Sequence, residues 1–251
     1  MTRIRFTFDP DQERKAEKIL SQCGSFVSEK APEAAFALHV GSRQLELRSL
    51  KQNFDPLIVN FLSGRSYHRY RYGGGRGQLI AKACGIKSKT SLNILDATGG
   101  LAGDAFVLAT LGADVRVLER HPVIAALVKD GLDRAKSAEE FQALKIDLIN
   151  QDAIRYMQTT RQPRADIVYV DPMYPHRKKK SLVKKEMRII RDIVGNDEDS
   201  DLLLHAALKF AKKKVVVKRP SYADYLNGAE PQLQYQGKNS RYDVYLVKYE
   251  N

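Results

Sequence analysis

From about residue 78 onward, the chain alternates between short apolar segments typical of strands and longer amphipathic segments typical of helices. Parallel strands need long crossover connections, so this alternation predicts a parallel sheet with helices on both faces. Two further strand-type segments near the C-terminus predict a hairpin at the sheet edge. The seven predicted strands are "SLNILDA", "ADVRVLE", "KIDLIN", "ADIVYVD", "KKVVVKR", "PQLQYQG" and "RYDVYLVKY". The predicted fold class is therefore α/β, with a doubly wound, Rossmann-like sheet of seven strands.

The segments between these strands predict the crossover helices. They are "GDAFVLATLG", "HPVIAALVKDGLDRAK", a short helix from Asp152, and helices over about 181–194 and 201–211. Residues 1–75 differ, because "TRIRFTF" and "RQLELRS" alternate as half-buried strands do and "DPDQERKAEKILSQCG" carries helix start and stop signals. We therefore predict a small N-terminal α+β region over residues 1–75 and a Rossmann-like domain over residues 76–251.

The net charge favours a polyanionic partner. The chain has 42 Lys and Arg against 30 Asp and Glu, a formal charge of +12. Nucleic acid fits better than an anionic membrane, because the sequence has neither an amphipathic anchor nor an apolar stretch of ~20 residues. The N-terminus lacks an apolar signal region, and the two cysteines form no disulfide or metal pattern, which favours a reducing cytoplasm. Five scattered histidines predict no metal site.

Ligands on a sheet of this kind bind beyond the carboxyl ends of the strands. The first strand ends in "DATGGLAGD", where Asp96 precedes Gly99, Gly100 and Gly103. These glycines allow close backbone approach to a ligand, but they do not fit the dinucleotide fingerprint. The segment suits a cationic or hydroxyl-bearing ligand without a pyrophosphate. The alternative is a tight strand-to-helix turn with no ligand.

Acidic residues also follow the second and third strands. Glu119 lies 23 residues after Asp96, where a carboxylate can accept hydrogen bonds from both ribose hydroxyls. The alternative is a surface glutamate at a strand end. Asp152 follows the third strand and fits two roles equally well, as an acceptor for an adenine amino group or as the N-cap of the next helix.

The fourth strand ends in "DPMYPH", which offers groups that suit a flat base with an exocyclic amine. Asp171 supplies a carboxylate, Pro172 a backbone carbonyl, and Tyr174 an aromatic face for stacking. Two acceptors for the N–H groups favour the pyramidal, more nucleophilic amine and the positive charge that develops on it. The alternative is a strand that simply ends at a turn.

The Asp-Pro-Met-Tyr sequence resembles the Asp/Asn-Pro-Pro-Tyr/Phe motif of amino-group methyltransferases that use S-adenosylmethionine, with Met173 where proline is usual. Longer blocks resemble the bacterial RsmJ family over roughly residues 54–248. These blocks are "HRYRYGGGRGQLIAKACGIK", "LDATGGLAGDAFVLATLGADVRVLERHP", "DPMYPHRKKKSLVKKEMR" and "VVVKRPSYA".

This resemblance implies methylation of the N2 amino group of a guanine in small-subunit (16S) ribosomal RNA, with S-adenosylmethionine as cofactor. The expected mechanism is in-line transfer, with catalysis by positioning and electrostatics. Asp171, Pro172 and Tyr174 are the predicted catalytic residues. The family often has Gly-Arg-Asp where this chain has residues 102–104, so one arginine contact is missing. The predicted cofactor contacts, from the strand ends and the resemblance together, are Asp96, Gly100, Gly103, Asp104, Glu119, Arg120, Asp152, Ala153 and Asp171.

Two basic segments are candidates for RNA contact, although a charged run is often only a solvated face. Residues 176–191 carry eight Lys and Arg and leave directly from the predicted catalytic loop. Residues 63–77 interleave arginine with tyrosine, a mixture that suits phosphates and unstacked bases. The N-terminal region is a further candidate. The predicted RNA-contacting residues are Arg69, Arg71, Arg76, Arg177, Lys178, Lys179, Lys180, Lys184 and Lys185.

Three other functions remain compatible with parts of this pattern. A DNA adenine or cytosine amino methyltransferase shares the local motif. A non-catalytic RNA-binding protein on a methyltransferase fold would bind RNA without the cofactor. An NAD-dependent enzyme is disfavoured by the missing fingerprint and by the basic run that follows the catalytic loop.

Overall fold

The computed structural model describes residues 4–88, 91–162, 164–173, 185–195 and 200–247. The chain divides into two compact units. Unit 1 comprises residues 1–61, 121–142 and 180–195, and unit 2 comprises residues 62–120, 143–179 and 196–251. Unit 1 thus adds two later segments to the N-terminal region. The predicted domain boundary near residue 75 stays a prediction.

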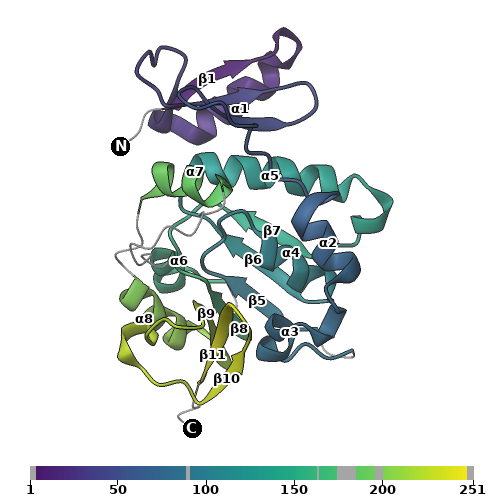
Figure 1. The fold of residues 1–251 in the computed structure, drawn as a ribbon, viewed down its shortest axis with the longest axis vertical. Coiled ribbons are helices and arrows are strands. Elements are labelled where there is room, and N and C mark those ends of the chain that lie inside the picture. Colours follow the sequence, from purple (N-terminus) through teal and green to yellow (C-terminus); the bar gives the residue numbers. More distant parts are fainter. Residues whose placement is uncertain (1–3, 89–90, 163, 174–184, 196–199, 248–251) are drawn as a thin grey trace. The chain divides into compact units, whose positions relative to one another are not determined.

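The sheet of unit 2 has the seven predicted strands, in the order β10-β11-β9-β8-β5-β6-β7 (Figure 1). Strands β5 to β9 run parallel, and β11 pairs antiparallel with both β9 and β10. The predicted hairpin at the edge is therefore confirmed. The strands are β5 (Asn93–Asp96), β6 (Asp114–Leu118), β7 (Ile146–Ile149), β8 (Ile167–Val170), β9 (Lys214–Pro220), β10 (Leu233–Gln236) and β11 (Ser240–Leu246).

The helices that the sequence predicted for unit 2 are also present. They are α4 (Gly103–Thr110), α6 (Ala153–Thr159) and α8 (Ser200–Phe210). Two more helices, α2 (Gly64–Tyr72) and α3 (Leu79–Cys84), precede the first strand of the sheet. Helix α2 has no buried residue, so its arginine, tyrosine and glycine composition gave no apolar period from which to predict it. It packs against α4, and α3 packs against β10 and β11.

The two faces of β8 carry different chemistry. Val168 and Val170 belong to an apolar cluster that also contains Leu204, Ala207 and Phe210 of α8. Strand side chains alternate between faces, so Tyr169 points to the opposite side of the sheet. One face of the central sheet is therefore covered by this apolar cluster, while the opposite face combines buried apolar residues such as Ile167 and Val216 with Tyr169.

Unit 1 contains a second sheet, of four strands in the order β2-β1-β3-β4. Strands β1 and β4 match the two alternating segments predicted from the sequence. Strand β3 did not give that signal, because all five of its residues are buried and its sequence does not alternate. The strands and α-helices of unit 1 are β1 (Ile4–Phe8), α1 (Glu13–Cys23), β2 (Val27–Ser28), β3 (Phe36–Val40), β4 (Leu45–Ser49), α5 (Pro122–Lys136) and α7 (Lys185–Val194).

Short 3-10 turns complete the two units. They are η1 (Pro10–Gln12), η2 (Gly24–Phe26), η3 (Gly75–Gly77), η4 (Glu139–Phe141) and η5 (Leu226–Gly228).

Helix α5 is tied to the rest of unit 1 through Asp130. Its Oδ1 lies 2.9 Å from Nζ of Lys15 on α1, and its Oδ2 accepts a hydrogen bond of 3.1 Å from the backbone N–H of Leu45 on β4. Arg134, one turn further along α5, lies 3.0 Å from the same Oδ2. The side chain of Asp130 is only 7% exposed, so these partners compensate for the burial of its charge.

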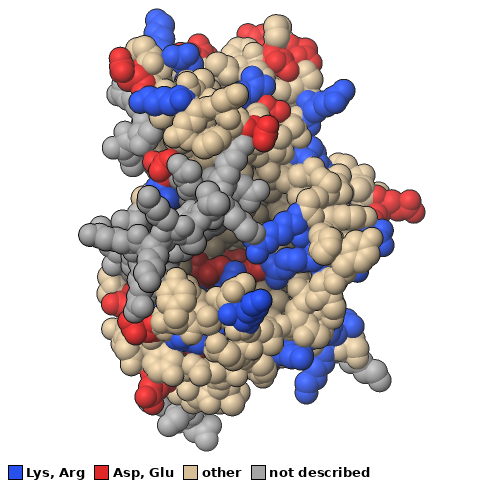
Figure 2. Space-filling model, viewed as in Figure 1, with Lys and Arg blue, Asp and Glu red and all other residues tan. Residues whose placement is uncertain are grey.

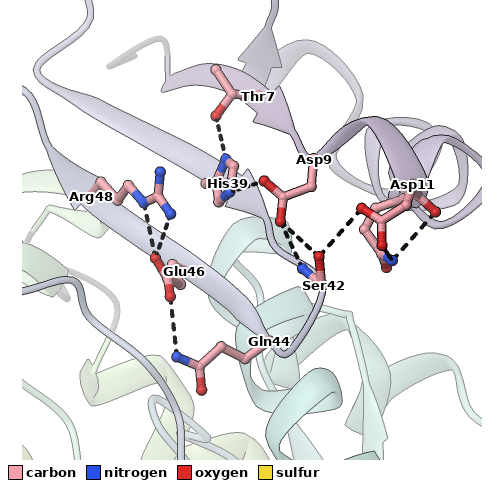
Figure 3. Close-up of polar contacts among 9 residues, drawn as sticks. Thr7, Asp9, Asp11, His39, Ser42, Gln44, Glu46 and Arg48 are labelled. Atoms are coloured by element: carbon pink, nitrogen blue, oxygen red, sulfur yellow. Dashed lines mark hydrogen bonds and ion pairs between the residues drawn. The ribbon is translucent and has the colours of Figure 1, made fainter.

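A polar network joins the ends of β1 and β3 (Figure 3). The ring of His39 lies between Thr7 and Asp9, with Nδ1 3.0 Å from the Thr7 hydroxyl and Nε2 3.2 Å from the Asp9 carboxylate. Asp9 also accepts from the backbone N–H of Ser42, at 2.9 Å. The network thus fixes the turn that follows β3, and we assign it a structural role.

Figure 2 shows Lys and Arg side chains spread over the face in view, with fewer Asp and Glu side chains among them. This distribution agrees with the formal charge of +12. Among the helices of the described ranges, none is both long and apolar enough to cross a bilayer.

Candidate active site

Strand register brings four ionisable side chains to one face of the sheet in unit 2. Asp96 on β5 pairs with Tyr169 on β8, Tyr169 pairs with Val216 on β9, and Lys218 on β9 pairs with Tyr242 on β11. Paired residues of adjacent strands project to the same side, and residues two apart along a strand do so as well. The sheet face opposite the apolar cluster of Val168 and Val170 therefore carries Asp96, Tyr169, Lys218 and Tyr242.

The turn after β5 connects the ends of three strands. Oδ1 of Asp96 accepts a hydrogen bond of 3.0 Å from the Thr98 backbone N–H, and the Thr98 hydroxyl accepts one of 2.6 Å from the Asp171 backbone N–H after β8. The backbone N–H of Gly100 donates to Oε2 of Glu119 after β6, at 2.8 Å. Residues predicted separately as strand-end groups thus lie within one hydrogen-bonded assembly.

Two glycines of this turn are required by its geometry. A Cβ on Gly99 would lie 2.7 Å from Cγ1 of Val117 and 2.8 Å from the Leu118 carbonyl oxygen, so the turn lies directly against β6. Gly100 has φ of +50°, a left-handed conformation that strains other residues, and a Cβ there would make only an ordinary contact of 3.9 Å with the Thr98 carbonyl oxygen. Apart from the two chain neighbours of Gly100, no side chain of the described residues lies within 4 Å of that Cβ position.

Glu119 is held firmly although it carries a charge. It is 7% exposed, and its backbone carbonyl accepts a hydrogen bond of 2.7 Å from the Asn150 side chain, which follows β7. The same Asn150 amide donates to the carbonyl of Arg120, an exposed residue, at 3.2 Å. The asparagine therefore fixes the backbone at Glu119 relative to the end of β7.

Asp152 is the N-cap of α6. Its Oδ1 accepts a hydrogen bond of 2.8 Å from the Arg155 backbone N–H, and the adjacent Ala153 is buried in the core. The N-cap alternative is thus confirmed, while a contact to adenine stays a prediction for both residues.

We expect Asp152→Ala to lower the free energy of unfolding by about 1 kcal/mol, because the end of α6 loses its cap. Asp152→Ser keeps an oxygen at the cap, so its loss of stability should be much smaller. Chemical denaturation of both variants measures the difference. Any loss of ligand affinity in the serine variant then belongs to the missing carboxylate, whereas equal destabilisation by serine and alanine would contradict the capping role.

Asp104, in the first turn of α4, accepts hydrogen bonds from three side chains. Its Oδ1 lies 2.5 Å from NH1 of Arg69 on α2, and its Oδ2 lies 2.8 Å from Nζ of Lys218 and 2.7 Å from the hydroxyl of Tyr169. The side chain of Asp104 is 10% exposed. Asp104 thereby joins α2, α4, β8 and β9. The prediction that it contacts the cofactor is not tested by this arrangement and stays a prediction.

Asp171 stands beside this cluster, and Lys218 connects the two. Nζ of Lys218 lies 2.7 Å from Oδ2 of Asp171, whose side chain is 38% exposed, so the carboxylate is both anchored and accessible. Pro172 is buried and Met173 is partly exposed. Tyr174, Arg177, Lys178, Lys179, Lys180 and Lys184 lie outside the described residues, as does the side chain of Lys185 at the start of α7.

Burial and neighbouring charges set the ionisation of this cluster. Burial raises the pKa of Asp96, which is 2% exposed, to about 7, and the nearby carboxylates of Asp104 and Asp171 act in the same direction. Burial would also raise the pKa of Asp104, but Lys218 and Arg69 outweigh it and lower that pKa. Burial alone would lower the pKa of Lys218, and the carboxylates of Asp171 and Asp104 raise it well above its usual value.

The predicted RNA-contacting arginines of α2 and η3 have different surroundings. Arg69 is paired with Asp104 and is 25% exposed. Arg71 is exposed on α2, with its guanidinium 5.4 Å from the ring centroid of Tyr67 and 5.5 Å from that of Tyr70. Arg76 is exposed and donates to the Leu111 carbonyl at 3.3 Å. RNA contact by these three residues stays a prediction.

The sequence alone did not identify Thr98, Asn150, Tyr169 or Lys218 as members of this site. Thr98 lies inside the glycine-rich segment and Asn150 directly precedes the predicted Asp152 region, so both had a positional signal. Tyr169 and Lys218 lie within strand segments, where only the register reveals which face they share. Among the residues that the structure describes, no group of three or more His, Cys, Asp or Glu side chains could hold a metal ion.

Comparison with known proteins identifies the family of this chain. A model of the SAM-dependent methyltransferase family matches residues 22–247. The protein named "Ribosomal RNA small subunit methyltransferase J" from Coxiella burnetii is 50% identical over 241 residues, which cover 95% of this chain and 94% of that protein. The protein of the same name from Tolumonas auensis is 45% identical, with coverage of 95% and 96%.

A solved structure agrees in fold over almost the whole chain. The crystal structure of a SAM-dependent methyltransferase from Neisseria gonorrhoeae superposes with a TM-score of 0.79 at 35% identity, covering 98% of this chain and 97% of that one. The chain therefore belongs to the SAM-dependent methyltransferase family that includes ribosomal RNA small subunit methyltransferase J, and it is a methyltransferase that uses S-adenosylmethionine.

Proposed function

We propose that this enzyme methylates the exocyclic N2 amino group of a guanine in 16S ribosomal RNA of the small subunit. The observation that carries the proposal is the place of Asp171, an accessible carboxylate hydrogen-bonded through its backbone to the glycine turn of β5. The names of relatives at 45–50% identity support ribosomal RNA as the substrate. The guanine N2 position follows from the resemblance of the sequence motifs and is part of the proposal.

The strand ends of unit 2 fit S-adenosylmethionine. The side chain of Glu119 accepts from the Gly100 backbone N–H in the glycine turn, and we propose that this carboxylate also accepts from the ribose hydroxyls. Asp152 and Ala153, which follow the next strand, are proposed to contact the adenine, and Asp96, Gly103, Asp104 and Arg120 complete the proposed set. When bound, the cofactor supplies an electrophilic methyl group on a positively charged sulfur.

The contribution of the chain to methyl transfer is to orient and polarise the amine. We infer that Asp171 and the Pro172 carbonyl accept the two N–H groups of the guanine N2 amine. This favours the pyramidal amine and stabilises the positive charge that develops on nitrogen. Tyr174 is proposed to stack on the base. Holding the amine in line with the methyl group supplies most of the remaining catalysis.

Basic and aromatic side chains are the proposed contacts to the RNA backbone. Arg71 is exposed against two tyrosine rings, which gives a cation and a flat aromatic surface in one place. The formal charge of +12 supports a polyanionic substrate. The other proposed contacts are Arg69, Arg76, Arg177, Lys178, Lys179, Lys180, Lys184 and Lys185, together with residues 1–75. A cytoplasmic location remains a prediction from the cysteine content.

Transfer of labelled methyl groups tests the substrate class. Purified enzyme with labelled S-adenosylmethionine should modify small ribosomal subunits whose RNA lacks the methyl group, and should leave duplex DNA unlabelled. Label only in DNA would favour the amino methyltransferases of DNA instead. RNA binding without binding of S-adenosylmethionine, measured by calorimetry, would favour a non-catalytic RNA-binding protein.

A further inference from the structure

Lys218 occupies a position fixed by the sheet rather than by a loop. The parallel register of β8 and β9 pairs Val170 with Val217, so the next residues along, Asp171 and Lys218, emerge beside each other. The Lys218 side chain is 27% exposed, and both strands on which the pair depends lie in the middle of the sheet order. The lysine thus has a rigid base from which to reach the catalytic carboxylate.

Asp104 holds the ammonium group from the other side. Nζ of Lys218 lies 2.8 Å from Oδ2 of Asp104 and 2.7 Å from Oδ2 of Asp171. Asp104 is itself held by Arg69 and by the Tyr169 hydroxyl, and it lies at the N-terminal end of α4, which favours its negative charge. The lysine is therefore bound between one fixed carboxylate and one that is exposed to substrate.

We propose that Lys218 is a positioning residue for methyl transfer, because its anchored ammonium group holds the Asp171 carboxylate ionised and in one orientation. With Oδ2 of Asp171 bound to Lys218, Oδ1 is the oxygen that we infer accepts from the target amine. This inference rests on the proposed function, in which Asp171 accepts from the target amine. It adds a residue from β9 to the proposed catalytic residues, which otherwise follow β8.

The surroundings of Asp171 explain why a cation is needed there. Burial raises the pKa of Asp171 and the nearby Asp104 carboxylate raises it further, whereas Lys218 and Arg69 act to lower it. A protonated carboxyl group would lose acceptor strength toward the amine. Among the residues that the structure describes, the ionisable groups around Asp171 are Asp96 on β5, Arg69 on α2, Asp104 on α4, Tyr169 on β8, Lys218 on β9 and Tyr242 on β11.

The test compares Lys218→Met with Lys218→Arg and with the wild type. In Lys218→Met we expect kcat to fall by about 10²-fold and the pKa of Asp171 to rise further, because the neighbouring positive charge is lost. The acid limb of the pH–rate profile should move to higher pH by the same amount. Affinity for S-adenosylmethionine should change little. Lys218→Arg keeps the charge, so the acid limb should stay near its wild-type position and part of kcat should return.

Lys213→Met is the matched control, because Lys213 lies one residue before β9 and makes an exposed ion pair with Asp166 at 2.9 Å. It removes the same charge and should leave both kcat and the Asp171 pKa unchanged. Thermal melting checks that each variant is folded. Carbon-13 NMR of the carboxyl groups, with Asp171→Asn to assign the signal, measures the pKa without any substrate.

The two readouts separate this inference from the proposed function. A wild-type enzyme that does not methylate small subunits would refute the proposed function, while the NMR titration would still show whether Lys218 keeps Asp171 ionised. An unchanged Asp171 pKa in folded Lys218→Met overturns the inference, even if kcat falls. An unchanged kcat with an active wild type overturns it as well.

Discussion

Replacing Asp171 with alanine is expected to lower kcat for methyl transfer by about 10³-fold, with little change in affinity for S-adenosylmethionine. The variant removes the carboxylate that accepts from the target amine, and it leaves Lys218 without one of its two carboxylate partners. Methyl incorporation into unmethylated small subunits, under saturating cofactor, measures kcat. Calorimetry measures the cofactor affinity.

Asp171→Asn gives a finer version of the same test. The amide keeps an oxygen acceptor of the same size, so activity should lie between those of the wild type and the alanine variant. Asp201→Ala serves as the control, because Asp201 is an exposed carboxylate in the first turn of α8 and should be dispensable. Full activity of Asp171→Ala would remove this residue from the mechanism.

Replacing Glu119 with alanine is expected to weaken binding of S-adenosylmethionine by about 100-fold. The carboxylate is proposed to accept from two ribose hydroxyls, and hydrogen bonds to a charged group contribute about 1.5–3 kcal/mol each. The variant also frees the Gly100 backbone N–H, whose present acceptor is Oε2 of Glu119 at 2.8 Å. Calorimetric titration with the cofactor measures the change, and no RNA is needed.

Asp114→Ala is the control for this measurement. Asp114 lies at the opposite end of the same strand, β6, and is exposed, so its loss should leave cofactor affinity unchanged. If Glu119→Ala bound the cofactor as tightly as the wild type, the proposed ribose contact would be wrong. The cofactor would then have to occupy another part of the sheet edge.

The fold was largely predictable from the sequence because strand and helix periods are local. All seven strands of the large sheet, and the antiparallel hairpin at its edge, were predicted from short apolar segments. Helix α2 was not predicted, since none of its residues is buried and its composition has no apolar period. Strand β3 was missed for the opposite reason, because it is buried throughout and does not alternate.

The site was only partly predictable, because part of it depends on which strands are neighbours. Asp96, Glu119 and Asp171 could be found from the rule that ligands lie beyond the strand ends. Lys218 could not, since its role depends on the pairing of β8 with β9 and on the face that this pairing gives it. Arg69 was predicted as an RNA contact from its basic surroundings, and its ion pair with Asp104 becomes visible only in three dimensions.

The grouping of the chain into two units also depends on long-range contacts. The helix-forming segment after β6 was predicted as a crossover of the sheet, and α5 is indeed present over Pro122–Lys136. Asp130 of α5 makes an ion pair with Lys15 and accepts a hydrogen bond from the Leu45 backbone N–H, and α5 belongs with the N-terminal strands to unit 1. Nothing in the local sequence period of α5 indicates that Asp130 has partners 85 and 115 residues away.

Mapping the methylated nucleotide tests the central claim most directly. Small subunits that lack the modification are incubated with the enzyme and S-adenosylmethionine, and the RNA is digested and analysed by mass spectrometry, with Asp171→Ala in parallel. We predict N2-methylguanine at a single position of 16S ribosomal RNA with the wild type, and none above background with the variant. A methyl group on another base or another atom of guanine, or equal product from the variant, would contradict the account.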